Sequence, residues 1–233
     1  MHIQLNNLKK CFGEHVAVDI PHFTIDNGQV VGLVGNNGAG KTTLFRLMLD
    51  LAKATEGNVL LGDIDPANSE DWKLQTGAFI DNSFLIDFLT AEEYFEFVGK
   101  VSGMTKEQVE ERLKTFETFM GDEIIGKKKY IRDFSAGNKQ KIGIVAALLN
   151  SPQLVILDEP FNFLDPSSQN QLKRILTEFN RSTGATVMVS SHNLQHTVEI
   201  STRVALLENG KIIEDIDNSD GKAEEILDKY FNV

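Results

Sequence analysis

A glycine-rich stretch contains the side chains best suited to chemistry. Residues 35–42 read GNNGAGKT, the pattern G-x-x-x-x-G-K-[ST], between the apolar run VVGLV and a sequence with helical periodicity. In that strand-to-helix context the pattern predicts a phosphate-binding loop, and the alternative is a glycine-rich turn with a surface lysine. The predicted nucleotide ligands are Gly35, Asn36, Asn37, Gly38, Ala39, Gly40, Lys41, Thr42 and Thr43.

The residue types of this loop fit that role. Its glycines let the backbone turn so that N–H groups surround a phosphate. Lys41 would reach the β- and γ-phosphates and take part in catalysis, and the Thr42 hydroxyl would bind Mg²⁺.

Two adjacent acids follow a short apolar run. Residues 154–157 read LVIL, as expected for a strand buried on both faces, and Asp158, Glu159 and Pro160 come next. Ligands of parallel sheets bind at the carboxyl ends of the strands. We predict that Asp158 holds Mg²⁺ and that Glu159 is the general base that polarises the attacking water. The alternative is a solvated strand end closed by Pro160.

Another apolar strand, within VMVSSHNL, ends in Ser191 and His192. A lone histidine is more often structural, but at the exit of a core strand His192 could hydrogen-bond a γ-phosphate. We therefore predict a catalytic role for His192.

The segment RDFSAGNKQK, residues 132–141, predicts a second site for an anion. Ser135 is a suitable N-cap, small residues follow it, and the apolar run IGIVAALL continues the helix. A helix N-terminus offers free N–H groups and the positive end of the helix dipole. Ser135 and Gly137 are the predicted contacts.

These residues need an α/β sheet to position them. Strand-length apolar runs alternate with helical periodicity, which predicts a mainly parallel core. The first third reads as strands, with Asn27-Gly28 as a hairpin turn. In the middle, a capping box at Thr90 opens a helical region. We expect one domain, 1–233, with a core of about 1–87 and 151–233 and an inserted α-helical subdomain of about 88–150.

Composition limits the classes of function. The chain has 233 residues, 41% of them hydrophobic, and a formal net charge of −11. An acidic chain is a poor candidate for sequence-independent nucleic-acid binding. The single cysteine, Cys11, cannot form an internal disulfide. The start shows no signal-peptide pattern, and no run approaches the ~20 apolar residues of a membrane span. We expect a cytoplasmic protein that meets a membrane only through a partner.

Together these segments resemble the nucleotide-binding domain of ATP-binding cassette (ABC) transporters, over essentially the whole chain. FSAGNKQK is similar to the signature usually read LSGGQ, FNFLD to the D-loop that ends here at Asp165, and His192 to the H-loop histidine. Phe12 resembles the aromatic residue that stacks on adenine; an ordinary strand aromatic is the alternative. The resemblance implies a P-loop NTPase core, an N-terminal antiparallel β subdomain, and ATP and Mg²⁺ as cofactors.

The resemblance also implies partners. In this family two domains dimerise head to tail, so Ser135 and Gly137 would contact the ATP bound to the partner's phosphate loop. We expect an ATP-dependent homodimer, or a heterodimer with a related chain, that powers a separate membrane permease. The alternative is a soluble ABC-type ATPase acting on a macromolecular machine. An unrelated nucleotide kinase or GTPase would leave the signature, the D-loop and His192 unexplained.

Two departures from the family pattern stand out. The signature has Phe134, Ala136 and Asn138 where Leu, Gly and Gln are usual. Asp81 stands where the family has a glutamine; a carboxylate can bind Mg²⁺ but cannot donate an amide hydrogen bond. Asp81 is thus a further candidate metal ligand. The apolar residues after it, Phe84 and Leu85 among them, predict either a contact with the permease or packing of the helical insert.

Overall fold

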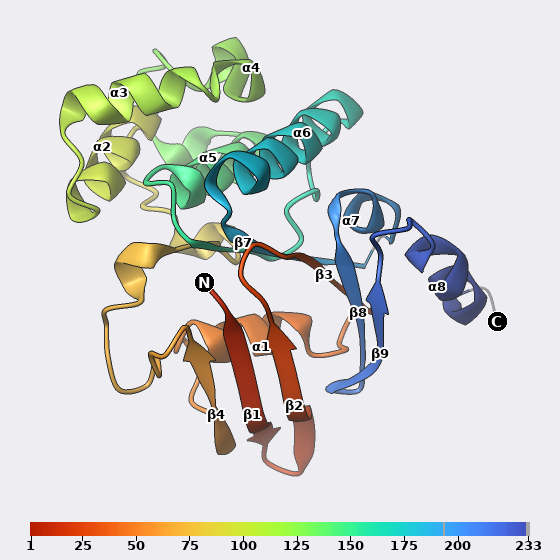
Figure 1. Cartoon of the computed structure of the whole chain (residues 1–233). Coiled ribbons are helices and arrows are strands. Elements are labelled where there is room, and N and C mark those ends of the chain that lie inside the picture. Colours follow the sequence, from red (N-terminus) through yellow and green to blue (C-terminus); the bar gives the residue numbers. More distant parts are fainter. Residues whose placement is uncertain (193, 232–233) are drawn as a thin grey trace.

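The computed structural model describes residues 1–192 and 194–231, whose strands form two sheets (Figure 1). The strands are β1 (Ile3–Phe12), β2 (His15–Ile25), β3 (Val30–Val34), β4 (Glu56–Leu61), β5 (Thr76–Phe79), β6 (Leu154–Leu157), β7 (Thr186–Ser191), β8 (Arg203–Glu208) and β9 (Lys211–Asp217). The helices are α1 (Lys41–Met48), α2 (Ala91–Val101), α3 (Lys106–Lys114), α4 (Glu117–Met120), α5 (Ala136–Leu148), α6 (Pro166–Thr183), α7 (Leu194–Ile200) and α8 (Ala223–Phe231).

The small sheet has the order β2-β1-β4 and is antiparallel throughout. Its hairpin turn lies between Phe12 and His15, which pair across β1 and β2. The prediction of a hairpin at Asn27-Gly28 is therefore wrong, because β2 and β3, on either side of that turn, belong to different sheets. The burial patterns give the reason: β2 has exposed positions, whereas all of β3 is buried.

The large sheet has the order β5-β6-β7-β3-β8-β9. All neighbouring pairs from β5 to β8 are parallel, and β9 joins β8 antiparallel. The carboxyl ends of β3, β6 and β7 consequently lie at one edge, where the phosphate loop, the Asp158–Glu159 pair and His192 follow them in the sequence.

Helix α1 lies between the two sheets. Its residues Leu44, Phe45 and Met48 belong to the same hydrophobic cluster as Leu5 of β1 and Leu33 of β3. Burying large apolar side chains on both sides stabilises a helix of eight residues that would not form alone.

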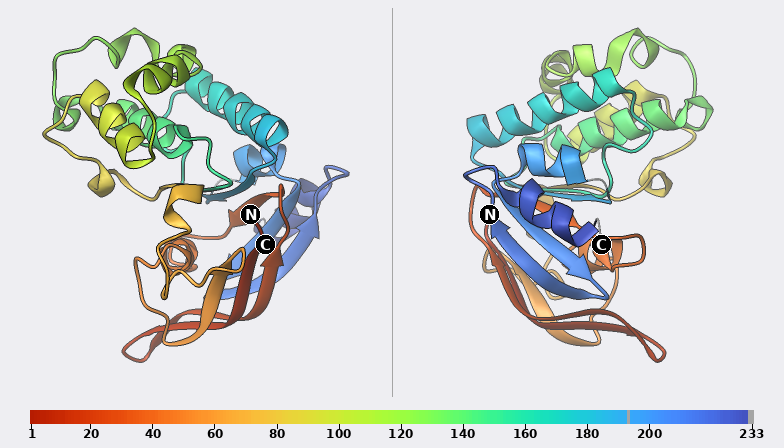
Figure 2. Two further views of the ribbon diagram at one scale, coloured as in Figure 1. Left: turned by 60° about the vertical axis from the view of Figure 1, so that its left-hand side comes forward. Right: turned by 90° about the vertical axis from the view of Figure 1, so that its right-hand side faces the viewer.

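The opposite face of the large sheet is covered by α5 and α6. Ile142 and Leu148 of α5 and Leu172 of α6 share a cluster with Val155 and Val187 of the sheet. Helix α5 approaches β5 closely, since a Cβ atom on Gly143 would lie 2.1 Å from the Phe79 ring. Figure 2 shows α2 to α6 on one side of the large sheet and the small sheet on the other.

Helices α2 and α3 begin with the capping boxes that their sequences suggest, at Thr90 with Glu93 and at Thr105 with Gln108. From α3, the Arg112 guanidinium lies 4.9 Å from the Phe116 ring centroid and 5.8 Å from that of Phe179 in α6. It also donates to the carbonyl of Leu148 at the end of α5. Arg112 thus joins α3 to both helices that cover the sheet.

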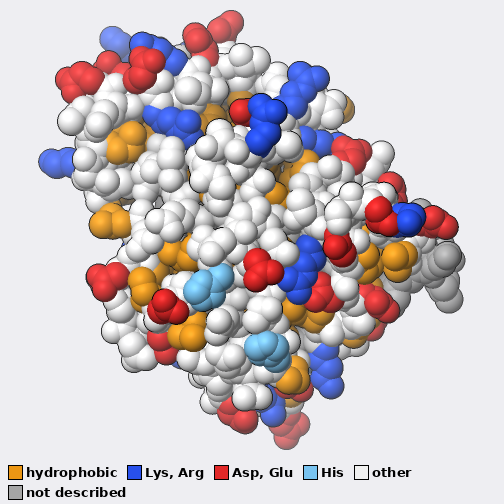
Figure 3. Space-filling view, viewed as in Figure 1, with side chains coloured by type: hydrophobic (Ala, Val, Ile, Leu, Met, Phe, Trp, Pro, Cys, Tyr) orange, Lys and Arg blue, Asp and Glu red, His pale blue; other side chains and the backbone are white. Residues whose placement is uncertain are grey.

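In the described part of the chain, no helix has the length and apolar character needed to cross a membrane. On the face shown in Figure 3, basic and acidic side chains are intermixed.

Candidate active site

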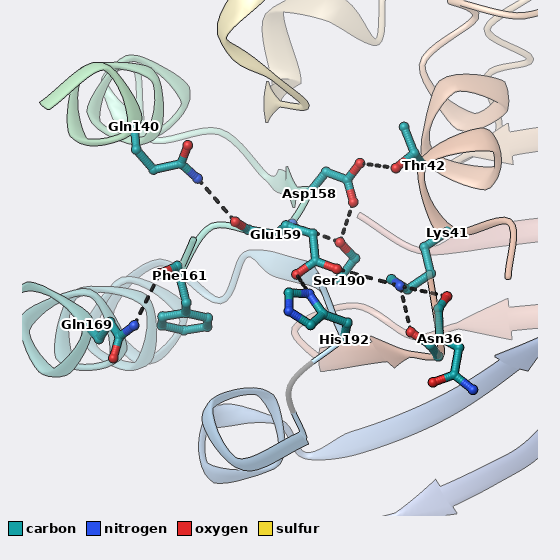
Figure 4. Close-up of polar contacts among 11 residues, drawn as sticks. Asn36, Lys41, Thr42, Gln140, Asp158, Glu159, Phe161, Gln169, Ser190 and His192 are labelled. Atoms are coloured by element: carbon teal, nitrogen blue, oxygen red, sulfur yellow. Dashed lines mark hydrogen bonds and ion pairs between the residues drawn. The ribbon is translucent and has the colours of Figure 1, made fainter. Parts of the chain in front are cut away.

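The phosphate loop links β3 to α1 in a conformation that depends on glycine. Gly40 has φ 110° and lies directly before α1, where an added Cβ would come within 2.5 Å of the Ala17 carbonyl oxygen. The Lys41 side chain turns back over the loop, and its Nζ donates to the carbonyl oxygens of Gly35 at 2.6 Å and Asn36 at 3.3 Å. The loop therefore surrounds a buried ammonium group, as Figure 4 shows.

The Asp158 carboxylate accepts hydrogen bonds from two hydroxyl groups. Thr42 Oγ1 donates to one carboxylate oxygen and Ser190 Oγ, from β7, donates to the other. Asp158 is buried, and burial raises the pKa of its carboxyl above the ordinary value, although the two hydrogen bonds oppose this shift. The structure thus brings together Thr42 and Asp158, two of the three predicted Mg²⁺ ligands, from distant parts of the sequence.

Glu159 lies between two nitrogen groups. Its carboxylate is 2.8 Å from His192 Nδ1 and 3.5 Å from Lys41 Nζ. The backbone of Glu159 has φ 47°, in the left-handed region that a residue with a Cβ rarely adopts. The three predicted catalytic side chains therefore meet at the ends of β3, β6 and β7 (Figure 4).

Phe12 stands beside the phosphate loop. Its side chain is 56% exposed and lines a hollow of about 300 Å³ with His15, residues 37–43 and Glu159. An exposed aromatic ring at the mouth of a phosphate-binding loop is available to stack on a planar base.

Ser135 and Gly137 open α5, as their sequence indicates. Ser135 caps the helix by accepting from the N–H of Asn138 at 3.3 Å. At Gly137 the backbone passes close to the segment before α6, because an added Cβ would lie 2.6 Å from the Phe163 carbonyl oxygen. Residues 135–138 line a hollow of about 600 Å³ that shares no residue with the hollow at the phosphate loop.

Asp81 is placed differently from the other candidate metal ligands. Its carboxylate accepts from the N–H and hydroxyl of Ser83 and from Arg46 at 3.3 Å. These hydrogen bonds lower the pKa of Asp81 against the opposing effect of partial burial, the largest single influence. Asp165 of the D-loop segment caps α6 by accepting from Ser167 and Ser168.

Sequence reasoning missed two polar residues that hold the acidic pair. Ser190 contacts Asp158 and also accepts from the N–H of Glu159 at 2.9 Å, and Gln140 of α5 donates to the Glu159 carbonyl at 3.2 Å. A polar residue within the otherwise apolar strand VMVSS was a usable signal for Ser190. No sequence signal pointed to Gln140, because its hydrogen bond to Glu159 depends on how α5 packs on the sheet.

The residues present fit a nucleotide with a magnesium ion. Among the described residues no three His, Cys, Asp or Glu side chains form a metal cluster. Mg²⁺ suits such a site, because it usually takes one or two protein oxygens and completes its coordination with phosphates and water. Thr42 and Asp158 supply two adjacent oxygens, and Lys41 supplies the cation for a phosphate.

The fold and site define a P-loop ATPase with a signature helix. The family description "ABC transporter" matches residues 18–162. The chain belongs to the ABC transporter family, and within it to the ATP-binding subunits that hydrolyse ATP.

Similar proteins agree with this assignment. The chain is 33% identical to the bacitracin transport ATP-binding protein BcrA of Enterococcus faecalis, over 94% of this chain and 70% of that protein. It is 32% identical to a methionine import ATP-binding protein of Bacillus anthracis, over 91% of this chain and 64% of that protein.

Solved structures share the fold. An ATP-binding subunit of an ABC transporter superposes with a TM-score of 0.85 at 25% identity, covering 99% of this chain and 94% of that chain. A dimeric ATP-binding cassette in a post-hydrolysis state, bound to ADP and Pi, superposes with a TM-score of 0.82 at 24% identity, covering 92% of this chain and 98% of that chain.

Proposed function

We propose that this chain hydrolyses ATP at a site completed by a second copy and that hydrolysis drives a separate membrane permease from its cytoplasmic face. The observation that carries the proposal is the pair of separate hollows, one at the phosphate loop and one at the start of α5. A single chain cannot close both on one nucleotide. Two copies arranged head to tail can, and a protein of the same fold whose solved structure is dimeric supports the pairing of two copies. A heterodimer with a related chain would bring together the same two surfaces, the phosphate loop of one chain and the start of α5 of the other.

Each residue has a proposed role. Residues 35–43 hold the phosphates, with Lys41 on the β- and γ-phosphates, and Phe12 stacks on the adenine. Thr42 and Asp158 hold Mg²⁺, which neutralises phosphate charge when bound. Asp81, hydrogen-bonded to Ser83 and Arg46, stays a prediction as a further metal ligand.

Glu159 is the proposed general base. It accepts a proton from water attacking the γ-phosphate, and His192, in contact with Glu159, orients that phosphate and the carboxylate. Ser135 and Gly137 of the partner chain supply hydrogen-bond donors to the same phosphate. The domain division proposed from the sequence, a core of about 1–87 and 151–233 with a helical subdomain of about 88–150, places Ser135 and Gly137 in the insert and Glu159 in the core.

The test is the mass of Glu159→Gln in solution. Glutamine keeps the size of the side chain but cannot act as a base, so ATP persists. We expect static light scattering to show dimer with ATP and Mg²⁺ and mainly monomer with ADP. Equal masses in both nucleotides would exclude the ATP-dependent homodimer.

A second substitution tests the surface that forms the dimer. Ser135→Arg, added to Glu159→Gln, removes the cap and puts a bulky side chain over the helix start, so the ATP-dependent dimer should disappear. Arg132→Ala, also exposed but outside the hollow at residues 135–138, serves as the control. If the dimer survives Ser135→Arg, the role assigned to Ser135 and Gly137 is wrong even if ATP is hydrolysed.

A further inference from the structure

Gln140 is a buried polar residue that the proposed mechanism does not use. It lies in α5, is 4% exposed, and donates from Nε2 to the backbone carbonyl of Glu159 at 3.2 Å (Figure 4). A buried amide needs a partner, and here the partner is the peptide group of the proposed general base. The contact joins residues that are 19 positions apart in the sequence.

The backbone of Glu159 is held from both sides. Its N–H donates to Ser190 Oγ at 2.9 Å, and its carbonyl accepts from Asn162 N at 3.1 Å as well as from Gln140. A carbonyl oxygen has two lone pairs, so both bonds can form at once. These bonds hold Glu159 at φ 47°, where a residue with a Cβ is strained, and that conformation places its carboxylate beside Lys41 and His192.

We propose that Gln140 is a positioning residue: it holds the peptide of Glu159 and couples the start of α5 to the catalytic carboxylate. The coupling rests on the proposed function, in which the partner's nucleotide contacts Ser135 and Gly137. Gln140 follows Gly137 by three residues, about one helical turn, on the same helix. A shift of α5 when it closes on the partner's phosphate therefore moves the donor that holds Glu159. Each copy thereby senses, at its own base, the nucleotide bound to the other.

The chain offers a matched control. Gln169 of α6 makes the same kind of bond, from its Nε2 to the carbonyl of Phe161 at 3.3 Å, two residues after Glu159 (Figure 4). Losing Gln169 removes a glutamine-to-backbone hydrogen bond from the same segment without touching the Glu159 peptide.

The experiment compares Gln140→Met with Gln169→Met in the full chain. Methionine is of similar length but cannot donate. We expect Gln140→Met to lower kcat about tenfold or more, because small displacements of a catalytic group cost up to about 100-fold, while the equilibrium affinity for ATP stays within about twofold. Gln169→Met should keep kcat within about twofold. An unchanged kcat in Gln140→Met, or an equal fall in both variants, would overturn the proposal.

A double substitution shows whether Gln140 acts through Glu159. If it does, adding Gln140→Met to Glu159→Gln should leave the residual rate within about twofold, whereas independent effects would multiply. Multiplying effects would overturn the coupling. If Gln140→Met does not fold, as judged by circular dichroism, Gln140→Leu takes its place in both comparisons. An inactive Glu159→Gln with a fully active Gln140 variant would refute this inference alone, while a fully active Glu159→Gln would refute the proposed function.

Discussion

Asp158 and Glu159 are neighbours in the sequence with different surroundings. Asp158 is buried under two hydroxyl groups, and burial raises the pKa of its carboxyl. Glu159 contacts the nitrogen atoms of Lys41 and His192. Two adjacent carboxylates in different environments suit different tasks. We propose that Asp158 binds Mg²⁺ and that Glu159 accepts the proton of the attacking water.

The raised pKa of Asp158 predicts an unusual variant. Because the folded-state pKa lies above 3.8, ionisation of Asp158 lowers the free energy of unfolding as pH rises through the interval from 3.8 to the folded-state value. Asp158→Asn cannot ionise and so avoids this loss in the free energy of unfolding. In the absence of nucleotide the variant should melt at the same temperature as the parent or higher at pH 7, and this advantage should shrink toward pH 4.

Activity should change in the opposite direction. Asp158→Asn removes the charge of the proposed metal ligand, so magnesium-dependent ATP hydrolysis should fall by roughly 100-fold or more. The two readouts are thermal melts at several pH values and steady-state phosphate release. A lower melting temperature at pH 7 would mean that the hydrogen bonds from Thr42 and Ser190 outweigh the cost of burial.

Lys41→Ala tests the phosphate loop. A charge-assisted hydrogen bond to phosphate contributes roughly 1.5–3 kcal/mol, so ATP affinity should fall by about 10- to 100-fold and hydrolysis should be lost. Lys53→Ala is the control, since Lys53 lies on the surface and pairs with Asp50. Equal ATP binding by Lys41→Ala and the parent, measured with a fluorescent nucleotide, would contradict the assignment.

The sequence predicted individual residues best where the pattern is local. The phosphate loop is one continuous segment, and the acids follow directly after an apolar run, so their positions could be predicted from the strands. The polar position of Ser190 in an apolar strand is a local signal, but its contact with Asp158, like that of Gln140 with Glu159, depends on how β7 and α5 pack against the end of β6. The hydrogen bond from Arg46 to Asp81 likewise depends on how α1 packs.

Among the elements, the segment between β5 and α2 carries exposed aromatic residues. Phe84 is 47% exposed and Phe88 is 68% exposed, whereas Leu85 is 6% exposed and belongs to the main hydrophobic cluster. Of the two alternatives given by the sequence, a permease contact or packing of the helical insert, Leu85 therefore follows the second, because its side chain packs in the core. Phe84 and Phe88 are the residues of this segment that a permease could contact.

Phe88→Glu should release the permease while the domain stays folded. An apolar side chain that a partner covers contributes roughly 1.5–3 kcal/mol, so affinity should fall at least about tenfold. Ile213→Glu on β9, which is also exposed, is the matched control. The measurement is co-purification of the complex together with the melting temperature of each variant; a complex that survives Phe88→Glu shows that the contact lies elsewhere.

Turns between elements were harder to predict than the elements. The strands around Asn27-Gly28 were recognised, but their assignment to different sheets depends on α1 filling the space between those sheets. The helix at Ala91–Val101 was predictable because its capping box is local and the hydrogen bonds of Thr90 and Glu93 form within one turn.

At the scale of the whole molecule, the proposed function divides each nucleotide site between two copies. The phosphate loop at the start of α1 and the signature at the start of α5 line different hollows. The net charge of −11 means that two copies repel each other at long range, so the short-range contacts formed across the bound nucleotide have to overcome that repulsion. We expect the ATP-dependent dimer of Glu159→Gln to strengthen as salt is raised from low to physiological ionic strength, as measured by light scattering.

The contacts of Arg112 bear on how the stability of the helical region depends on ionic strength. The guanidinium lies against two aromatic rings and a carbonyl, in a place where burial lowers its pKa, and none of these three partners is an ion. High salt concentrations that screen the surface ion pairs should therefore leave the interface of α3 with α5 and α6 intact. Arg112→Lys keeps the charge but loses the flat group that fits between the rings, so it should open this interface at every ionic strength and lower the melting temperature by several degrees, as a loss of about 1 kcal/mol would. In the parent protein, the packing of α3 against α5 and α6 therefore depends on the shape of the guanidinium group and should not weaken as the salt concentration rises.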